Sequence, residues 1–273
     1  MVVKRHYGRL DTEFEMRLFK NGLLVSLLTV LIVGCSAQET DPTANWSAEE
    51  FYNRAREEML DGGFTPAVDH YEKLIGRYPY GPYAEQARMD LAYAYFRDGQ
   101  SEAALDAIDR FIKLYPLYPS VDYLYYLRGL VYFRREVSIF ERFAPQDPSS
   151  REVASARQSF DAFMLLLTMY PDSSYSEDAS QRMVYLRNRM ASHEVHVANY
   201  YMKREAFVAV NGRARFVLEN FPGTPAVPDA LGLLVKSYRL LGEETLAASS
   251  LRVLEVNYPE HPATRDARAI VIN

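Results

Sequence analysis

The sequence predicts an all-α protein, an α-solenoid of about five helix pairs. One observation is an aromatic residue followed by proline, which recurs along the chain at Pro79, Pro116, Pro171, Pro222 and Pro259. Because proline cannot continue a helix, each of these positions predicts the end of one. The other observation is that no stretch shows sustained alternation of apolar and polar residues, so essentially no sheet is expected.

Small residues stand in a fixed register before four of these prolines. Counting back 24 residues gives Ala55, Ala92, Ala198 and Val235, and counting back 12 gives Ala67, Ala104, Val210 and Ala247. This spacing resembles the tetratricopeptide motif, in which helices A and B cross closely at small residues and a proline ends helix B. The sequence therefore predicts about five tetratricopeptide-type pairs.

The third and fourth units depart from the regular length. Gly129 fits as the small residue of the third unit, but Pro171 then lies 42 residues later instead of 24, so this unit carries about 18 extra residues, near 135–152. Its apolar Ile139, Phe140 and Phe143 suit either a partner contact or a flap packed on its own repeat. Helix A of the fourth unit is expected to be long, from about Ser176 to Met202.

Local signals place the first pair. Ser47 and Glu50 have capping-box spacing, so helix A should begin directly after Ser47. Gly62 and Gly63 predict the break between helix A and helix B.

The N-terminus has the features of a bacterial export signal. Basic Arg17 and Lys20 precede an apolar run over 23–33, which is shorter than the roughly 20 apolar residues of a membrane-spanning helix. Residues 1–34 are therefore predicted to be a signal peptide. Since Met16 would start a signal of ordinary length, residues 1–15 are either an upstream-start artefact or an unusually long leader.

The signal ends in Ile32, Val33, Gly34 and Cys35, which resemble a lipobox. In that interpretation Cys35 is lipidated and anchors the chain permanently, because several acyl chains bind a membrane far more strongly than one. Ser36, in place of the aspartate that retains lipoproteins in the inner membrane, favours the outer membrane. The alternative is an ordinary signal peptide with a coincidental cysteine. Residues 35–46 lack apolar periodicity and are expected to be a flexible tether.

Charge and motif content exclude several functions. Without residues 1–34 the chain has 26 basic and 33 acidic side chains, a net of 26 − 33 = −7, which argues against nucleic-acid binding. His193 and His196 lie three residues apart, not at the four-residue spacing of a zinc-protease helix, and Cys35 is the single cysteine. No catalytic motif is present, so the sequence predicts no metal, no cofactor and no enzyme. A lipid-anchored enzyme is the least favoured alternative.

Three sequence blocks resemble the BamD family, the lipoproteins of the outer-membrane β-barrel assembly machinery. They comprise Arg77 to Tyr83 leading into 90–95; Ile108 to Ile112 followed by Pro119, Asp122, Tyr123, Arg128 and Gly129; and Val197, Ala198, Tyr200, Tyr201, Arg204, Ala206, Val208, Ala209 and Val210. The resemblance extends from the lipobox to about Tyr258. These aromatic blocks are specific, because generic tetratricopeptide proteins share only the small residues and prolines.

The resemblance implies a scaffold on the periplasmic face of the outer membrane, held there by its lipid anchor alone. It implies that N-terminal repeats 1–3, over 47–171, receive C-terminal targeting strands of unfolded outer-membrane proteins. It also implies that C-terminal repeats 4–5, over 172–273, dock on a POTRA domain of BamA beside other Bam lipoproteins. The alternative is a generic cell-envelope adaptor that organises peptidoglycan or division machinery.

The resemblance and the residue chemistry together give candidate sites. For the substrate peptide the candidates are Tyr78, Tyr80, Tyr83, Tyr93, Tyr95, Arg77, Arg88 and Arg97. Tyrosines offer apolar faces with polar tips, and the arginines suit a terminal carboxylate. Several of these tyrosines, Tyr78 above all, fit packing between helices equally well. For the BamA contact the candidates are Arg213 and Arg215, beside Gly212, where the sequence departs from the family pattern.

Overall fold

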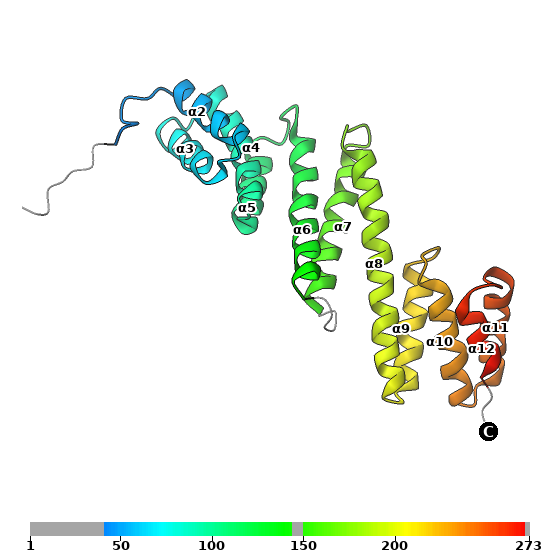
Figure 1. Cartoon of the computed structure of the whole chain (residues 1–273). Coiled ribbons are helices and arrows are strands. Elements are labelled where there is room, and N and C mark those ends of the chain that lie inside the picture. Colours follow the sequence, from blue (N-terminus) through cyan, green and yellow to red (C-terminus); the bar gives the residue numbers. More distant parts are fainter. Residues whose placement is uncertain (1–40, 144–149, 271–273) are drawn as a thin grey trace, which may run out of the picture. The chain divides into compact units, whose positions relative to one another are not determined.

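The computed structural model describes residues 41–143 and 150–270, and at 136–143 and 150–152 it describes the backbone alone. The described part is all helical and contains no strand. Its helices are α2 Ala48–Leu60, α3 Phe64–Arg77, α4 Pro82–Arg97, α5 Ser101–Leu114, α6 Val121–Phe143, α7 Ser150–Met169, α8 Ser176–Lys203, α9 Phe207–Asn220, α10 Val227–Leu240, α11 Glu244–Asn257 and α12 Pro262–Ala269. They form five successive pairs from α2/α3 to α10/α11, followed by the short α12 (Figure 1).

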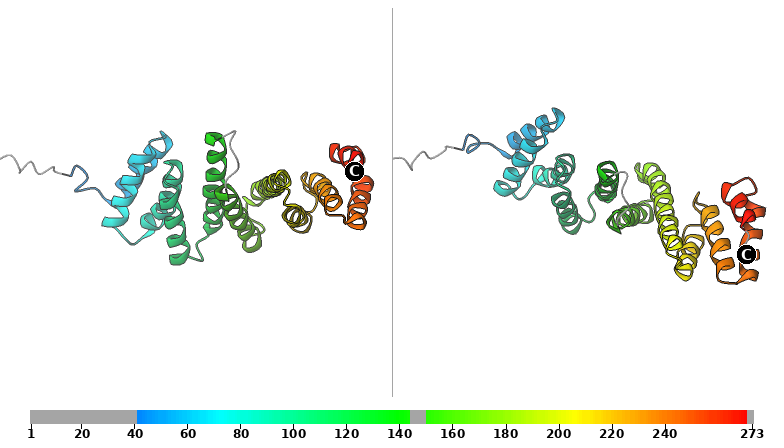
Figure 2. Two further views of the ribbon diagram at one scale, coloured as in Figure 1. Left: turned by 90° about the horizontal axis from the view of Figure 1, so that it is seen from below. Right: turned by 60° about the horizontal axis from the view of Figure 1, so that its bottom comes forward.

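Each helix packs on the next along the chain, and each pair lies beside the next one (Figure 2). This is the tetratricopeptide-type solenoid that the proline register predicts. From Ala48 onward the helices form one compact unit. The division into a substrate-binding half and a docking half therefore stays a functional prediction.

The five aromatic residues before the prolines end helix B of every pair. In each case the aromatic residue's backbone N–H donates to the carbonyl four residues earlier, at 2.7 Å for Tyr78 and 2.9 Å for Phe221. The following proline has no N–H to donate and stops the helix there. The predicted breaks are also confirmed, because α2 starts directly after Ser47 and Gly62 and Gly63 separate α2 from α3.

The small residues of the register lie where the paired helices cross. Those 24 and 12 residues before the prolines have no exposed surface: Ala55, Ala92, Ala198, Val235, Ala67, Ala104, Val210 and Ala247. Gly129 takes the same place in the third pair, where an added Cβ would lie 2.3 Å from the Phe163 ring. Buried Ser159, 12 residues before Pro171, is its counterpart on α7 and donates from Oγ to the Gly129 carbonyl at 2.9 Å.

The extra residues of the third unit lengthen its helices. α6 has 23 residues and α7 has 20, whereas α3 and α5 have 14 each. The backbone of Ile139, Phe140 and Phe143 continues α6. Their side chains, on which the prediction of a partner contact or a packed flap depends, lie outside the described part, as do residues 144–149.

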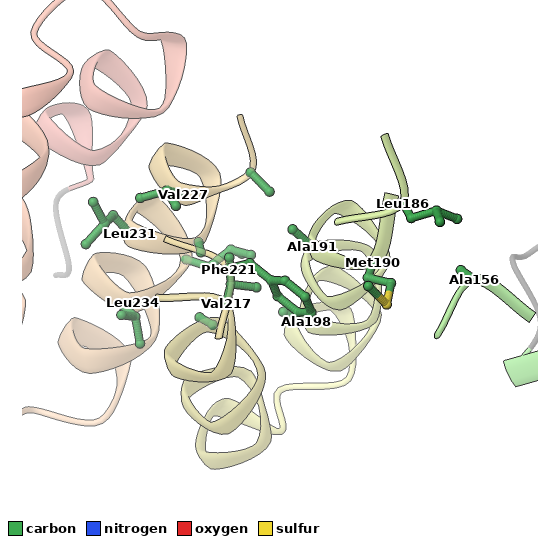
Figure 3. Close-up of a cluster of buried hydrophobic side chains, with 14 of the residues drawn as sticks. Ala156, Leu186, Met190, Ala191, Ala198, Val217, Phe221, Val227, Leu231 and Leu234 are labelled. Atoms are coloured by element: carbon green, nitrogen blue, oxygen red, sulfur yellow. The ribbon is translucent and has the colours of Figure 1, made fainter. Parts of the chain in front are cut away.

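Helix α8, with 28 residues, joins the third pair to the fourth. It packs on α7 and on α9, and its buried Leu186, Met190 and Ala198 belong to one apolar cluster with residues of α9 and α10 (Figure 3). The long helix expected over 176–202 is confirmed, and it carries a continuous core from the third pair to the last.

Candidate binding surfaces

Helix α4 carries five of the eight candidate substrate residues, but on two opposite faces. At 3.6 residues per turn, one face presents Tyr83, Gln86, Asp90, Tyr93 and Arg97, and the other presents Arg88, Leu91 and Tyr95. The first face lies with α2 and α6, the A helices, and we call it the A-side surface. The second faces α3 and α5, the B helices, across a hollow that we call the B-side cleft.

A hydrogen-bonded chain crosses the A-side surface. Asp90 Oδ2 accepts from the Tyr52 hydroxyl at 2.9 Å, and Asp90 Oδ1 accepts from Gln86 Nε2 at 2.9 Å. Gln86 Oε1 accepts in turn from the Tyr118 hydroxyl at 3.1 Å, and the Tyr83 ring lies 5.6 Å from that of Tyr52. This network joins α2, α4 and the segment before α6.

Burial dominates the electrostatics of this network. It raises the pKa of Asp90 above its usual value, although the hydrogen bonds from Gln86 and Tyr52 partly oppose the shift. Burial next to Asp90 likewise raises the pKa of Tyr52. The hydroxyl therefore stays protonated and keeps donating to the carboxyl group.

Arg97 and Tyr93 are engaged with each other at the end of α4. Arg97 Nη1 donates to the Tyr93 hydroxyl at 2.7 Å, and its guanidinium lies 4.4 Å from the centre of the Phe64 ring. These contacts hold the arginine against aromatic rings of its own repeats. Binding a terminal carboxylate here would compete with them.

The A-side surface continues as an aromatic wall on α6 and α8. Asp178 accepts from the Tyr126 hydroxyl at 2.6 Å and from Arg182 Nε at 2.5 Å. The Tyr126 and Tyr175 rings stack at 4.7 Å, and the Arg182 guanidinium lies 4.8 Å from the Phe133 ring centre. The rings of Tyr126, Phe133 and Tyr175 thus lie beside the charged pair of Asp178 and Arg182.

The B-side cleft is a hollow of about 370 Å³ between α3, α4 and α5. Its lining consists of Glu72, Ile75, Gly76, Arg88, Leu91, Tyr95, Ala103, Asp106, Ala107, Arg110, Phe111 and Leu114. The lining combines an apolar floor with two arginines and two carboxylates. Of the eight candidate residues, only Arg88 and Tyr95 line this cleft.

Some polar groups of the cleft are hydrogen-bonded to neighbouring residues. The Tyr95 hydroxyl donates to Glu72, and burial together with this bond raises the pKa of Tyr95 to about 12. Arg88 Nη2 donates to the carbonyl of Pro79 at 3.1 Å. Arg88 Nε is buried and has no acceptor among the described residues.

The remaining three candidates lie around the turn between α3 and α4. Tyr78 is half-buried and ends α3, so it has a structural role in the turn. Tyr80 is 89% exposed, just before Gly81, whose φ of +99° suits glycine. The Arg77 guanidinium lies 5.0 Å from the centre of the Phe51 ring. Tyr80 is therefore the most accessible tyrosine of the set.

The candidate docking arginines lie on α9. Arg213 Nη1 bonds Glu194 Oε2 at 3.0 Å, with the Arg213 side chain 46% exposed and the Glu194 side chain 9% exposed. Arg215 pairs with Glu219 at 3.3 Å on the exposed side of α9. Arg213 thus covers a nearly buried carboxylate and presents its other half outward.

Cys35 lies outside the described residues. Within the described ranges, no three His, Cys, Asp or Glu side chains gather into a possible metal site. No described helix combines the length and hydropathy needed to cross a membrane.

Comparison with known proteins identifies the family. Residues 44–254 match the family model YfiO, described as outer membrane lipoprotein. The outer membrane protein assembly factor BamD of Neisseria meningitidis serogroup B is 39% identical over 248 residues, which cover 89% of this chain and 93% of that protein. The chain belongs to the BamD family. BamD of Xylella fastidiosa Temecula1 is 40% identical over 88% of this chain and 83% of its own length, and BamD of Vibrio cholerae is 30% identical over 83% and 94%.

Several residues of both surfaces were not among the sequence candidates. Gln86 and Asp90 share the Tyr83 face of α4, and helical periodicity alone would have separated them from Arg88 and Tyr95. Asp106 and Arg110 lie three and seven residues after Ala103, so helical periodicity places all three on one face of α5. The link between Tyr126 and Asp178 spans 52 residues, and no local pattern signals it.

Proposed function

We propose that this member of the BamD family is a non-enzymatic assembly factor for outer-membrane proteins, working within the Bam machinery. It is anchored by lipid on Cys35 at the periplasmic face of the outer membrane. Its C-terminal repeats dock on a POTRA domain of BamA, and its N-terminal repeats receive C-terminal strands of unfolded outer-membrane proteins. The observation that carries the proposal is the match to curated BamD proteins over nearly the whole chain.

The aromatic content of the N-terminal repeats supports peptide reception. A β-strand presents alternate side chains to one side, so an unfolded barrel strand offers a row of apolar groups. Rings with polar tips accept such a row while their hydroxyls stay hydrogen-bonded. The exposed Tyr80 and the partly exposed Tyr83 lie where such a strand can approach α4.

Arg213 supports docking through the C-terminal repeats. A guanidinium has five N–H donors in a fixed fork, and Glu194 accepts a hydrogen bond from one of the two on Nη1. The exposed half of Arg213 suits an acidic group on a partner. Because Glu194 also orients the side chain, the docking geometry would be set before the partner arrives.

Co-purification tests the proposal. The full chain, tagged at its C-terminus, is isolated from native membranes in mild detergent, and its partners are identified by mass spectrometry. We expect BamA together with unfolded outer-membrane proteins. Loss of both would reject the assembly-factor function, and recovery of peptidoglycan or division proteins in their place would support the adaptor alternative.

A control separates docking from non-specific adhesion. Arg213→Ala should reduce BamA recovery, whereas Arg252→Ala, on an exposed position of α11, should leave it unchanged. Equal recovery with both variants would remove Arg213 from the proposed contact.

A further inference from the structure

We propose that the B-side cleft, not the A-side surface, holds the end of the bound peptide: an aromatic side chain enters the hollow and its neighbouring carboxylate binds Arg88 and Arg110. The inference rests on the proposed function, because it assumes that the N-terminal repeats bind a peptide. The binding position is the face of α4 that carries Arg88 and Tyr95, and it selects an aromatic side chain with a carboxylate beside it.

Small residues keep the hollow open. Gly76, Ala103 and Ala107 line it from α3 and α5, and a Cβ added at Gly76 would meet nothing within 4 Å. The volume of about 370 Å³ lies near the lower end of the usual range for ligand sites. Such a hollow suits one large side chain and the backbone next to it.

The floor of the cleft is apolar. Ile75, Leu91 and Phe111 line it, and Leu114, which is 55% exposed, lies at its margin. Leu91 and Phe111 are themselves packed in the protein, so their cleft-facing surfaces are held in place. Because Leu91 and Phe111 have almost no exposed surface, an aromatic ring bound here removes from water mainly its own apolar surface and that of Leu114.

The charged residues of the cleft match a chain terminus. Arg88 and Arg110 are suited to a carboxylate, and Asp106 and Glu72 can accept from the backbone N–H of the same residue. An aromatic residue at a free C-terminus carries all of these groups: a ring, a carboxylate and an N–H. An internal acidic side chain next to an aromatic residue supplies the same carboxylate and is the alternative source.

Arg88 has unused hydrogen-bonding capacity. Nη2 is held by the Pro79 carbonyl, which fixes the guanidinium near the start of α4. Nε is buried with no acceptor among the described residues, and a buried donor without an acceptor destabilises the state that contains it. Because Arg88 already lines the hollow, a carboxylate bound there would supply the acceptor that this donor lacks.

The A-side surface offers less of this chemistry. Its arginine, Arg97 at the C-terminal end of α4, donates to Tyr93 and lies on the Phe64 ring. Asp90 is bonded to Tyr52 and Gln86. The A-side surface is thus suited to the body of an extended strand, and the B-side cleft to an anchoring residue.

Peptide binding tests the assignment. The probe is a fluorescent ten-residue peptide with alternating phenylalanine and serine, ending in phenylalanine with a free carboxylate, titrated against the full chain in detergent. Gly76→Leu, which fills the hollow, should weaken binding at least tenfold. Gly212→Leu, a matched helical glycine on α9 whose Cβ also meets nothing within 4 Å, should change it less than twofold. Equal affinities for the two variants would overturn the proposal.

Two further arms identify the ligand groups. Replacing the terminal carboxylate by an amide, or introducing Arg110→Gln, should each weaken binding at least fivefold, and combining them should add little. A peptide amide with an internal Phe-Glu pair tests the other source of the carboxylate. Unchanged affinity for the amide and for Arg110→Gln would refute the carboxylate contact, and circular dichroism verifies that each variant is folded.

Crosslinking separates this inference from the proposed function. A photoreactive residue is placed at Ala107 in the cleft or at Tyr93 on the A-side surface, and the full chain is mixed with a urea-denatured outer-membrane β-barrel protein. Capture at Ala107 through the last residues of the substrate supports the inference. Capture of those residues at Tyr93 alone overturns it and leaves the proposed function standing. Capture at neither position counts against both.

Discussion

Gly129→Ala is the sharpest test of the helix packing. The added Cβ would lie 2.3, 2.4 and 2.7 Å from three atoms of the Phe163 ring, whereas ordinary contacts are 3.4–4 Å. Phe163 is fully buried, so its ring must shift by about 1 Å within packed surroundings. Overpacking of this kind costs about 1–3 kcal/mol. Replacing a helical glycine by alanine contributes about 0.5–1 kcal/mol in the opposite direction.

The net loss expected for Gly129→Ala is therefore about 0–2.5 kcal/mol, which corresponds to a lowering of Tm by up to roughly 10 °C for a chain of this size. Urea and thermal unfolding followed by circular dichroism measure it. Gly76→Ala is the matched control, because it also lies in a helix and its Cβ meets nothing within 4 Å. The control should be more stable than the native chain by about 0.5–1 kcal/mol.

Hydrogen exchange locates the effect. In a repeat stack each pair contacts only its neighbours, so Gly129→Ala should speed exchange first in α6 and α7. A Gly129→Ala chain as stable as Gly76→Ala, or exchange accelerated evenly along the chain, would refute the assignment of Gly129 as the crossing residue of the third pair.

Three other outcomes are expected. Burial raises the pKa of Asp90, so the folded chain binds a proton at this group more tightly than the unfolded chain does. The native chain should therefore gain free energy of unfolding relative to Asp90→Asn as the pH falls through the raised pKa towards the ordinary value of 3.8, and lose it as the pH rises. Free energies of unfolding in urea that stay parallel for the two chains from pH 4 to 7 would contradict this. Arg213→Ala should lower the free energy of unfolding by about 1 kcal/mol, a modest figure because this arginine is half-exposed. Adding Glu194→Gln should restore most of the loss, and no recovery in a double-mutant cycle would rule out the ion pair. Cys35→Ser should move the chain from the detergent phase to the aqueous phase on phase separation, and unchanged partitioning would reject the lipid anchor.

The helix pairs were predictable because their signals are local. A proline after an aromatic residue ends helix B within one turn, and the small residues 12 and 24 positions earlier fix where the helices cross. Gly129 does not follow from the 24-residue spacing, because Pro171 is displaced by the lengthened α6 and α7, and it was placed instead by Tyr132 three residues later. Ser159 was missed because a serine is not an expected crossing residue, yet it stands in the register position and bonds the Gly129 carbonyl.

The arrangement of the candidate residues did not follow from the list of them. The eight candidates between Arg77 and Arg97 stay a prediction as a binding site, and a linear list does not separate the two faces of α4. Helical periodicity separates them in principle: Arg88 and Tyr95 are seven apart and share a face, whereas Tyr93 lies opposite.

The contacts between repeats could not be predicted from the sequence. Tyr52 meets Asp90 across 38 residues, and the hollow beside Gly76 exists only because α3 and α5 lie on the same side of α4. Such pairings depend on how successive helix pairs stack, which no local spacing encodes.

Site-specific photocrosslinking in native membranes tests the central claim most directly. With the full chain, a probe at Ala107 in the second pair and a probe at Arg215 on α9 are irradiated separately, and the products are identified by mass spectrometry. We expect the first to capture outer-membrane proteins before they fold and the second to capture BamA. Capture of one and the same partner by both probes, or of neither class by either, would contradict the division of labour between the two ends of the helix stack.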